Sequence, residues 1–343
     1  MKLKKQKRKI LLLKKEYLIL FFTTLLCSVK QVSWAQQQLL GQYFNIMQTY
    51  APGLTGANDY LDINLGTRQQ WRNTDGAPKS NFFNANSTLL VNRMNPHEYN
   101  SIRVSDMSPY KKKNLKMGVG GYFMQNSVGP IDRTHLMAST ALHVLVLRDS
   151  YLSLGISTGY ILEQVDLRDL TVLNPNNDQV YQAYLSQGTS ASYMDNHIGL
   201  AFYSSRFYFS YSMISYLNSK LGRNEAFRQN STDLTHNFLG GVRLSLNQFF
   251  ELTPNFFLRK TPQTPTLLDA GVRLSYMNDL MLGLSYRNDK SFISMIRIAF
   301  KSIYSVTYSY EFKTANQNVR DLNTHELTIG VQLFNNQKYK PVW

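Results

Sequence analysis

The chain has 343 residues, of which 37 are Lys or Arg and 22 are Asp or Glu, so its formal net charge is +15. It is rich in aromatic residues, with 22 Tyr and 19 Phe, and it has one cysteine, Cys27. A basic excess of this size is typical of a nucleic-acid-binding protein or of a chain with a basic targeting segment. The position of the basic residues along the chain decides between the two.

The basic residues gather at the N-terminus. Eight of the first fifteen residues are Lys or Arg, and the apolar run Leu18–Val29 and the small residues Ser33 and Ala35 follow. This order predicts a secretory signal peptide, residues 1–35, cleaved before Gln36. The alternative is a membrane anchor, but twelve residues are too few, because a helix needs about 20 to cross a ~30 Å hydrocarbon core.

Removal of residues 1–35 changes the charge of the protein. They hold nine Lys or Arg and one Glu, which leaves 28 basic and 21 acidic residues and a net charge of +7. We therefore expect no nucleic-acid partner. Cys27 leaves with the signal, so we expect no disulfide, thiolate metal site or thiol chemistry. Leu26 precedes Cys27 where a lipoprotein signal would need a small residue, so we reject a lipid anchor.

Beyond residue 35 apolar residues alternate with polar and small ones. The clearest examples are Tyr151–Glu163, Leu268–Tyr276 and Tyr304–Phe312, which are nine to thirteen residues long. Globular strands have about five or six residues, whereas a membrane strand tilted by about 45° needs about 9–11. Of the three classes compatible with export, a soluble β-protein, a periplasmic binder and an outer-membrane barrel, the pattern favours the barrel.

Fourteen such segments predict a closed antiparallel transmembrane β-barrel over residues 59–343. They are 59–71, 80–91, 116–126, 131–146, 151–164, 194–204, 206–216, 234–246, 249–260, 266–277, 280–288, 291–300, 302–313 and 324–335. An even number places both ends of the barrel on one side. Residues 36–58 precede the first strand, and we expect a short periplasmic helix or a segment folded into the lumen.

The connections support this count. Those near 147–150, 204–205, 247–248, 278–279 and 301 are short and fall on the periplasmic side by parity. The long ones, 165–193, 217–233 and 314–323, fall on the extracellular side, as expected for outer-membrane barrels. One long connection, 92–115, falls on the periplasmic side against the rule, which indicates either a docking loop or an error in the count.

The faces predicted to point into the lumen carry balanced charge. They hold the following residues: Asp62, Arg68, Glu163, Arg243, Glu251, Arg259, Asp269, Arg273, Arg287, Arg297 and Glu311. His135 and His143 point inward as well. Six Arg and five acids favour bidentate ion pairs over an ion path of one sign. A paired network that packs the interior is the simpler interpretation, and a selectivity lining or substrate site is the alternative.

Signals for catalysis are weak. The chain has no H-E-x-x-H, G-x-S-x-G or G-x-x-x-x-G-K-[ST] motif, and its six histidines show no metal-ligand spacing. We expect no enzymatic activity, no metal site and no cofactor. A Ser, a His and an acid brought together from different strands would be the exception, and sequence cannot test it.

The stretch R-Q-Q-W-R-N-T-D-G-A-P-K, Arg68–Lys79, joins two predicted strands. Arg68 is predicted to face the lumen, whereas Trp71 ends the lipid-facing stripe, where a barrel carries its aromatic girdle. A soluble hairpin with a partly buried Trp is the alternative. Asp75, Gly76 and Pro78 then form a turn at the outer rim.

With these elements placed, the chain resembles the PorP/SprF family, outer-membrane proteins of the type IX secretion and gliding machinery of Bacteroidota. The resemblance rests on Arg68–Lys79, on Asn126–Thr134 with its Gly129, Pro130 and Arg133, on the late hairpin around Leu282–Arg287, and on the closing strand His325–Phe334. Two features depart from the family pattern: Tyr50–Ala57 stands where N-P-A-Y-A-G is common, and a tail follows Phe334.

The resemblance implies a non-enzymatic component in the outer membrane. Its partners would be outer-membrane lipid and either the periplasmic ring of the secretion machinery or a large secreted adhesin. The family has several paralogues, so the chain does not identify its own partner. A diffusion porin or small-solute transporter is the alternative function, motivated by the charged interior.

Overall fold

The computed structural model describes residues 39–71, 74–89, 114–147, 149–168, 172, 174–217, 234–262, 264–277, 279–301, 303–313 and 323–334. The chain divides into two units, Met1–Gln36 and Gln37–Trp343, and every described residue belongs to the second. The predicted signal peptide, nearly all of connection 92–115 and the tail after Phe334 lie outside the described residues.

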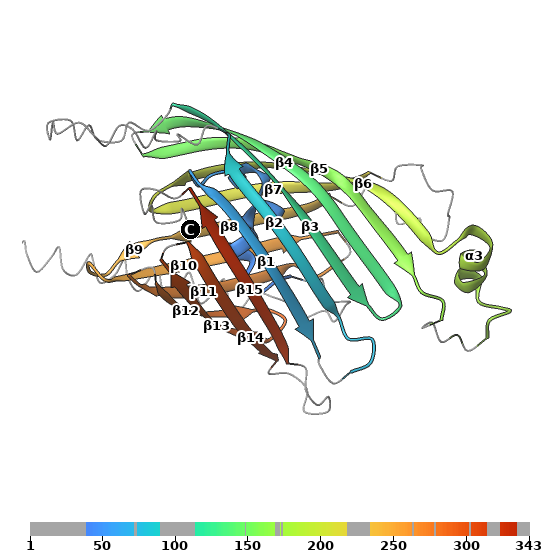
Figure 1. The fold of residues 1–343 in the computed structure, drawn as a ribbon. Coiled ribbons are helices and arrows are strands. Elements are labelled where there is room, and N and C mark those ends of the chain that lie inside the picture. Colours follow the sequence, from blue (N-terminus) through green and yellow to red (C-terminus); the bar gives the residue numbers. More distant parts are fainter. Residues whose placement is uncertain are drawn as a thin grey trace, which may run out of the picture. The chain divides into compact units, whose positions relative to one another are not determined.

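The second unit is a single sheet of antiparallel strands, in which almost every strand pairs with the next along the chain (Figure 1). The strands are β1 (Leu61–Gln70), β2 (Lys79–Thr88), β3 (Leu115–Val128), β4 (Ile131–Leu147), β5 (Ser150–Val165), β6 (Ser190–Ser204), β7 (Phe207–Leu217), β8 (Leu234–Val242), β9 (Leu244–Ser245), β10 (Phe250–Lys260), β11 (Leu267–Tyr276), β12 (Leu280–Arg287), β13 (Ser291–Phe300), β14 (Tyr304–Lys313) and β15 (Thr324–Leu333).

The sheet closes on itself. β1 pairs with β15 along its whole length, from Leu61 opposite Leu333 to Gln70 opposite Thr324. β8 and β9 both pair with β10, so they are two parts of one strand and the barrel has fourteen. The predicted fold class and strand number are therefore confirmed. The largest difference in a boundary is at β6, which begins at Ser190 rather than at residue 194.

The interruption between β8 and β9 has a local cause. The last β8 pair next to it joins Gly241 to Asn255, and the β9 pair on its other side joins Leu244 to Leu252. Pro254 of β10 lies in this gap. Proline has no N–H to donate to a ladder and is found where sheet pairing is interrupted.

The outer face of the barrel is apolar and the inner face is polar. Outward residues such as Leu65, Leu136 and Leu284 are 56, 62 and 64% exposed. Their strand neighbours that point inward, mostly Ser, Thr, Asn and charged residues, are buried. This is the reverse of a soluble β-protein and matches a barrel with hydrocarbon outside it. Among the described residues, no helix is long and apolar enough to cross a membrane.

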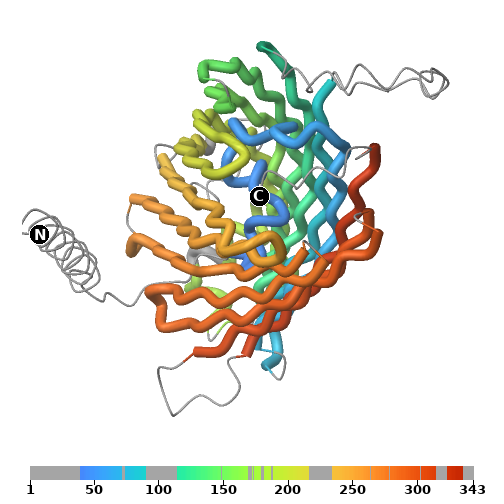
Figure 2. Tube along the Cα trace, turned by 90° about the vertical axis from the view of Figure 1, so that its left-hand side faces the viewer, coloured from blue at the N-terminus to red at the C-terminus, as the bar shows by residue number. Residues whose placement is uncertain are grey.

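Residues 39–60, here called the plug, occupy the interior of the barrel (Figure 2). The plug contains three short helices, η1 (Tyr43–Ile46), α2 (Met47–Tyr50) and η2 (Pro52–Leu54). Its apolar side chains form one buried cluster with inward residues of the wall, among them Tyr203, Tyr208 and Phe257. The hydrophobic core of this unit thus lies in the lumen.

The two ends of the barrel differ in their connections. One end, here called the short-turn end, bears the start of β1, the end of β15 and the connections 148–149, 205–206, 246–249, 277–279 and 301–303. The opposite, long-loop end bears the connection 166–189, which contains α3 (Gln179–Gln187) beyond β5 and β6 (Figure 1). The exception expected from the sequence persists, because 89–114 joins β2 to β3 at the short-turn end.

Candidate functional site

The beginning of the plug is bound by one carboxylate of the closing strand. Glu326 of β15 accepts hydrogen bonds from the backbone N–H groups of Gly41, at 2.8 Å, and Gln42, at 3.0 Å. The Gln42 side chain donates to the Glu326 carbonyl and to Ser309 Oγ. These contacts lie in the long-loop half of the lumen. Because Glu326 is 1% exposed, its charge needs these partners to offset desolvation.

Glu326 also begins a chain of buried ion pairs across the wall. Arg68 Nη1 contacts Glu326 Oε2 at 3.0 Å, and Arg68 Nη2 contacts Glu311 Oε2 at 2.8 Å. Arg287 contacts the same Glu311 at 3.5 Å and Asp269 at 3.1 Å. Three acids and two Arg thus form one network over β1, β15, β14, β12 and β11. Buried charges of this kind are stable only as a set, so loss of one member leaves another unpaired.

The rest of the plug is held by wall side chains that satisfy its backbone carbonyls. His143 Nε2 donates to the Thr55 carbonyl at 2.8 Å, and Lys116 Nζ donates to the Ala57 carbonyl at 2.7 Å. Ser153 and Ser212 donate to the carbonyls of residues 53 and 50. The plug helices are three or four residues long, so many of their carbonyls lack an intrahelical partner, and Ser153 and Ser212 supply donors to two of them.

Two glycines of the wall allow the plug to approach. A Cβ at Gly155 would collide with the Pro52 carbonyl, and a Cβ at Gly118 would collide with the Thr55 carbonyl. The wall backbone therefore touches the plug backbone at both positions. A glycine within a strand often marks such a close approach.

Aromatic rings and guanidinium groups pack around the plug. Phe257 lies 5.3 Å from the ring centroids of both Tyr43 and Tyr50. Arg259 lies 5.2 Å from the Tyr50 ring and donates to Asn237, and Arg273 lies 4.5 Å from the Phe44 ring. These two arginines, which the sequence assigned to an ion-pair network, are instead placed against aromatic faces of the plug.

The other predicted lumen residues lie in separate places. Arg243 and Glu251 form a pair at 3.7 Å near the short-turn end. Glu163 pairs at 2.8 Å with Arg133 at the long-loop rim, where the Arg133 side chain is 44% exposed. Asp62 accepts a hydrogen bond from Asn64 at 3.2 Å. The predicted residues are thus divided among several groups rather than joined in one network.

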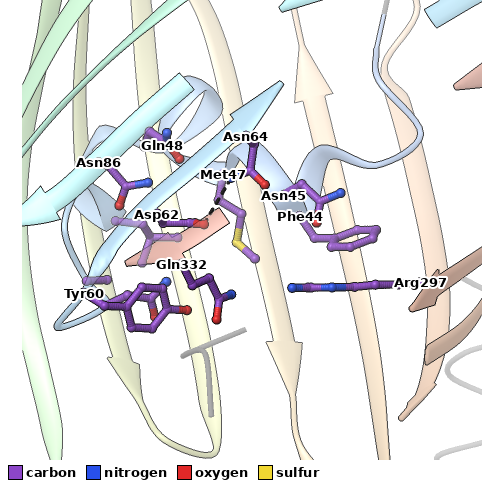
Figure 3. Close-up of a pocket in the computed structure, with 13 residues that line it drawn as sticks. Phe44, Asn45, Met47, Gln48, Tyr60, Asp62, Asn64, Asn86, Arg297 and Gln332 are labelled. Atoms are coloured by element: carbon purple, nitrogen blue, oxygen red, sulfur yellow. Dashed lines mark hydrogen bonds between the residues drawn. The ribbon is translucent and has the colours of Figure 1, made fainter. Parts of the chain in front are cut away.

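A small cavity remains at the short-turn end, between the plug and strands β1, β2, β13 and β15 (Figure 3). Its volume is about 50 Å³. Asp62 and Arg297 line it together with several Asn and Gln side chains, and Phe44, Met47 and Leu54 supply its apolar surface. Of the predicted lumen charges, these two are the ones that face this cavity.

Several buried polar residues were missed by the sequence reasoning. Glu326 and Lys116 bind the plug, and Asp195 pairs with His197 at 2.8 Å. The sequence does indicate that Glu326 points into the lumen, because it lies at an alternate position with Thr324 and Thr328 on the inward face of the closing strand. Asp195 and His197 both lie within the predicted segment 194–204, at alternate positions that face inward.

The motif residues at the long-loop end form contacts between connections. Gly129 N donates to the Gly76 carbonyl at 2.9 Å, and both glycines have positive φ, +55° and +68°. Asp166 N donates to the Pro130 carbonyl at 2.8 Å, which brings in a third connection.

The start of the first of these connections is fixed by backbone hydrogen bonds. Trp71 directly follows β1 with a φ of 49°, and its N–H donates to the Asn323 carbonyl at 2.9 Å. Gln70 N donates to the Pro78 carbonyl at 2.9 Å, whereas Asp75 is exposed. The role of these residues in recognition stays a prediction, as does a place for Trp71 in an aromatic girdle.

Comparison with known proteins was made for the whole chain. The family described as "Type IX secretion system membrane protein PorP/SprF" matches residues 32–331. No curated protein gives a significant match. Similar solved structures include the outer membrane protein Omp33 of Acinetobacter baumannii, with a TM-score of 0.44 and 6% identity over 80% of this chain and 99% of that chain.

Two further barrels of known structure have TM-scores in the same range. The CymD monoaromatic hydrocarbon channel has a TM-score of 0.42 and 9% identity over 88% of this chain and 94% of its own. The translocator domain of the autotransporter NalP from Neisseria meningitidis has a TM-score of 0.38 and 11% identity over 85% of this chain and 94% of its own. At such low identity no function is transferred from these proteins to this chain.

Proposed function

We propose, because this chain belongs to the PorP/SprF family of type IX secretion system membrane proteins, that it is a non-enzymatic anchor in the outer membrane. In this proposal the barrel holds either periplasmic components of the secretion machinery or a secreted surface adhesin. The partner binds at the rims and connections of the barrel, where the binding residues of rigid scaffolds commonly lie.

The plug is the observation that carries the proposal. It packs its apolar residues against the inner wall, and its backbone is hydrogen-bonded to Glu326, His143, Lys116 and serines of the wall. A barrel built to conduct solutes needs an open aqueous path. A lumen filled by a tightly held segment supports a role in which the barrel itself is a rigid support.

A diffusion porin is the second candidate, motivated by the charges of the lumen. The plug argues against it, and so does the burial of Arg68 and Arg287, whose side chains are 2 and 3% exposed and therefore do not line a water-filled path. Fourteen strands are also fewer than the 16–18 of porins with open channels.

The proposal is tested by cross-linking in intact outer membranes followed by purification through an affinity tag in the connection 166–189. We expect either lipoproteins of the type IX periplasmic ring or one large adhesin to be enriched. The first result assigns the protein to the secretion machinery, and the second assigns it to surface attachment. The control is a different outer-membrane barrel of the same cells with the same tag. Equal recovery of both classes with the control would overturn the proposal.

A further inference from the structure

The cavity at the short-turn end has a lining unlike the rest of the lumen. Amide side chains dominate it: Asn45, Gln48, Asn58, Asn64, Asn86 and Gln332. Figure 3 shows amides of the plug and of the wall around one space, with the Arg297 side chain reaching toward it. An amide offers both a donor and an acceptor, which matches the donor and acceptor of a peptide group.

Two of the residues that line this cavity each have a nitrogen atom without a hydrogen-bond partner among the described residues. Gln48 is 4% exposed, and its Nε2 is buried with no partner there. Arg297 Nε is likewise buried without a hydrogen-bond partner, and Asp62 is the acid that lines the same cavity. Buried polar groups are normally hydrogen-bonded, so unsatisfied groups that line one cavity indicate a missing ligand.

The charges around the cavity leave one positive charge in excess. Arg297 lines it, and Arg273 lies behind the Phe44 ring, which also lines it. Asp62 is the acid of the lining, while Glu251 is already paired with Arg243. An excess of one matches a singly charged anion better than a doubly charged phosphate group.

We propose that this cavity binds the carboxyl-terminal end of a peptide that enters from the short-turn end. The Arg297 guanidinium binds the terminal carboxylate through two parallel N–H···O bonds, the geometry that arginine provides. Gln48 and the neighbouring amides bind the last peptide group, and Phe44, Met47 and Leu54 contact the last side chain. A cavity of about 50 Å³ admits only the end of a chain.

The site goes beyond the proposed function by placing a contact at the periplasmic end. Asp62 is the second residue of β1 and Gln332 is next to the last residue of β15, so the cavity lies near that mouth. Short turns of outer-membrane barrels are periplasmic. A periplasmic partner with a free carboxyl terminus therefore fits the site.

The test uses the full mature chain in detergent and a fluorescein-labelled Ala-Ala-Ala peptide with a free carboxylate. Fluorescence polarisation is measured against the same peptide with an amidated carboxyl terminus. We expect the amide to bind about tenfold to a hundredfold more weakly, the range of a charge-assisted hydrogen bond. Arg297→Gln should weaken binding of the free-acid peptide by a similar factor and leave binding of the amidated peptide unchanged. Arg297→Lys should weaken binding of the free-acid peptide less.

Arg168→Gln is the matched control, because the Arg168 side chain is 89% exposed at the opposite end. Folding of each variant is checked by its heat-modifiable migration on gels. If Arg297→Gln does not fold, the affinities of the unsubstituted protein for the free-acid and amidated peptides still show whether the site binds a terminal carboxylate. Equal binding of the two peptides, or no binding of the acid at millimolar concentration, overturns the inference. Recovery of the partners by cross-linking would then leave the proposed function standing.

Discussion

Arginine side chains in the two halves of the lumen differ in their contacts. In the long-loop half Arg68 and Arg287 each contact two carboxylates, at 2.8 to 3.5 Å. In the short-turn half Arg297 lines a cavity, and its Nε has no hydrogen-bond partner among the described residues. Both halves bind the plug, but the arginines of the first half are committed to carboxylates, whereas Arg297 in the second half remains able to receive a ligand. Three substitutions test this comparison.

Glu326→Ala should have the largest effect, because it removes the acceptor of two plug N–H groups and of Arg68. Breaking a buried pair costs about 3–5 kcal/mol, and we expect that loss in the free energy of unfolding. Urea titration of the refolded barrel measures it. Glu163→Gln is the control, since its partner is half-exposed and surface pairs contribute up to about 1 kcal/mol. Equal losses in the two variants would contradict the assigned role of Glu326.

Gly155→Leu should destabilise the barrel less but displace the plug. The new side chain would occupy the position of the Pro52 carbonyl, and overpacking of this kind costs about 1–3 kcal/mol. We expect ion conductance in planar bilayers to rise as η2 moves. Ala138→Leu is the control, because Ala138 lies on the exposed outer face of β4. A closed Gly155→Leu barrel of unchanged stability would show that the plug does not need this approach.

Gly76→Ala tests the contact between the motif connections and should have the smallest effect. Alanine at a φ of +68° costs about 1–2 kcal/mol, and its Cβ would lie 3.1 Å from Gly129 Cα. Gly129→Ala has a similar positive φ but no atom within 4 Å of its Cβ. The difference between the two unfolding free energies therefore measures the contact. Identical losses would mean that the connections do not support each other.

Strand number and inward faces were predictable from sequence because side-chain alternation has a period of two. The partners of the inward charges were not predictable. Arg68 meets Glu311 because β15 lies between their strands after closure, and closure depends on a register that no local pattern specifies. The arginines at positions 259 and 273 were assigned to ion pairs because the aromatic residues of the plug had no predicted position.

The interior position of residues 39–60 had little local signal. Three helices of three or four residues show no periodicity, and the plug is stabilised by wall donors such as Lys116 and Ser212, which lie 59 and 162 residues from their acceptors along the chain. Gly118 and Gly155 lie within strands, and only the folded barrel identifies the plug backbone as their neighbour.

Single-channel recording in planar bilayers decides whether the barrel is closed by its own plug. The purified chain from residue 36 onward should show little steady conductance, whereas deletion of residues 39–58 should produce large, stable openings. The plug residues fill the lumen in the intact chain and leave a cavity of about 50 Å³. Large, stable pores formed by the intact chain would contradict the account.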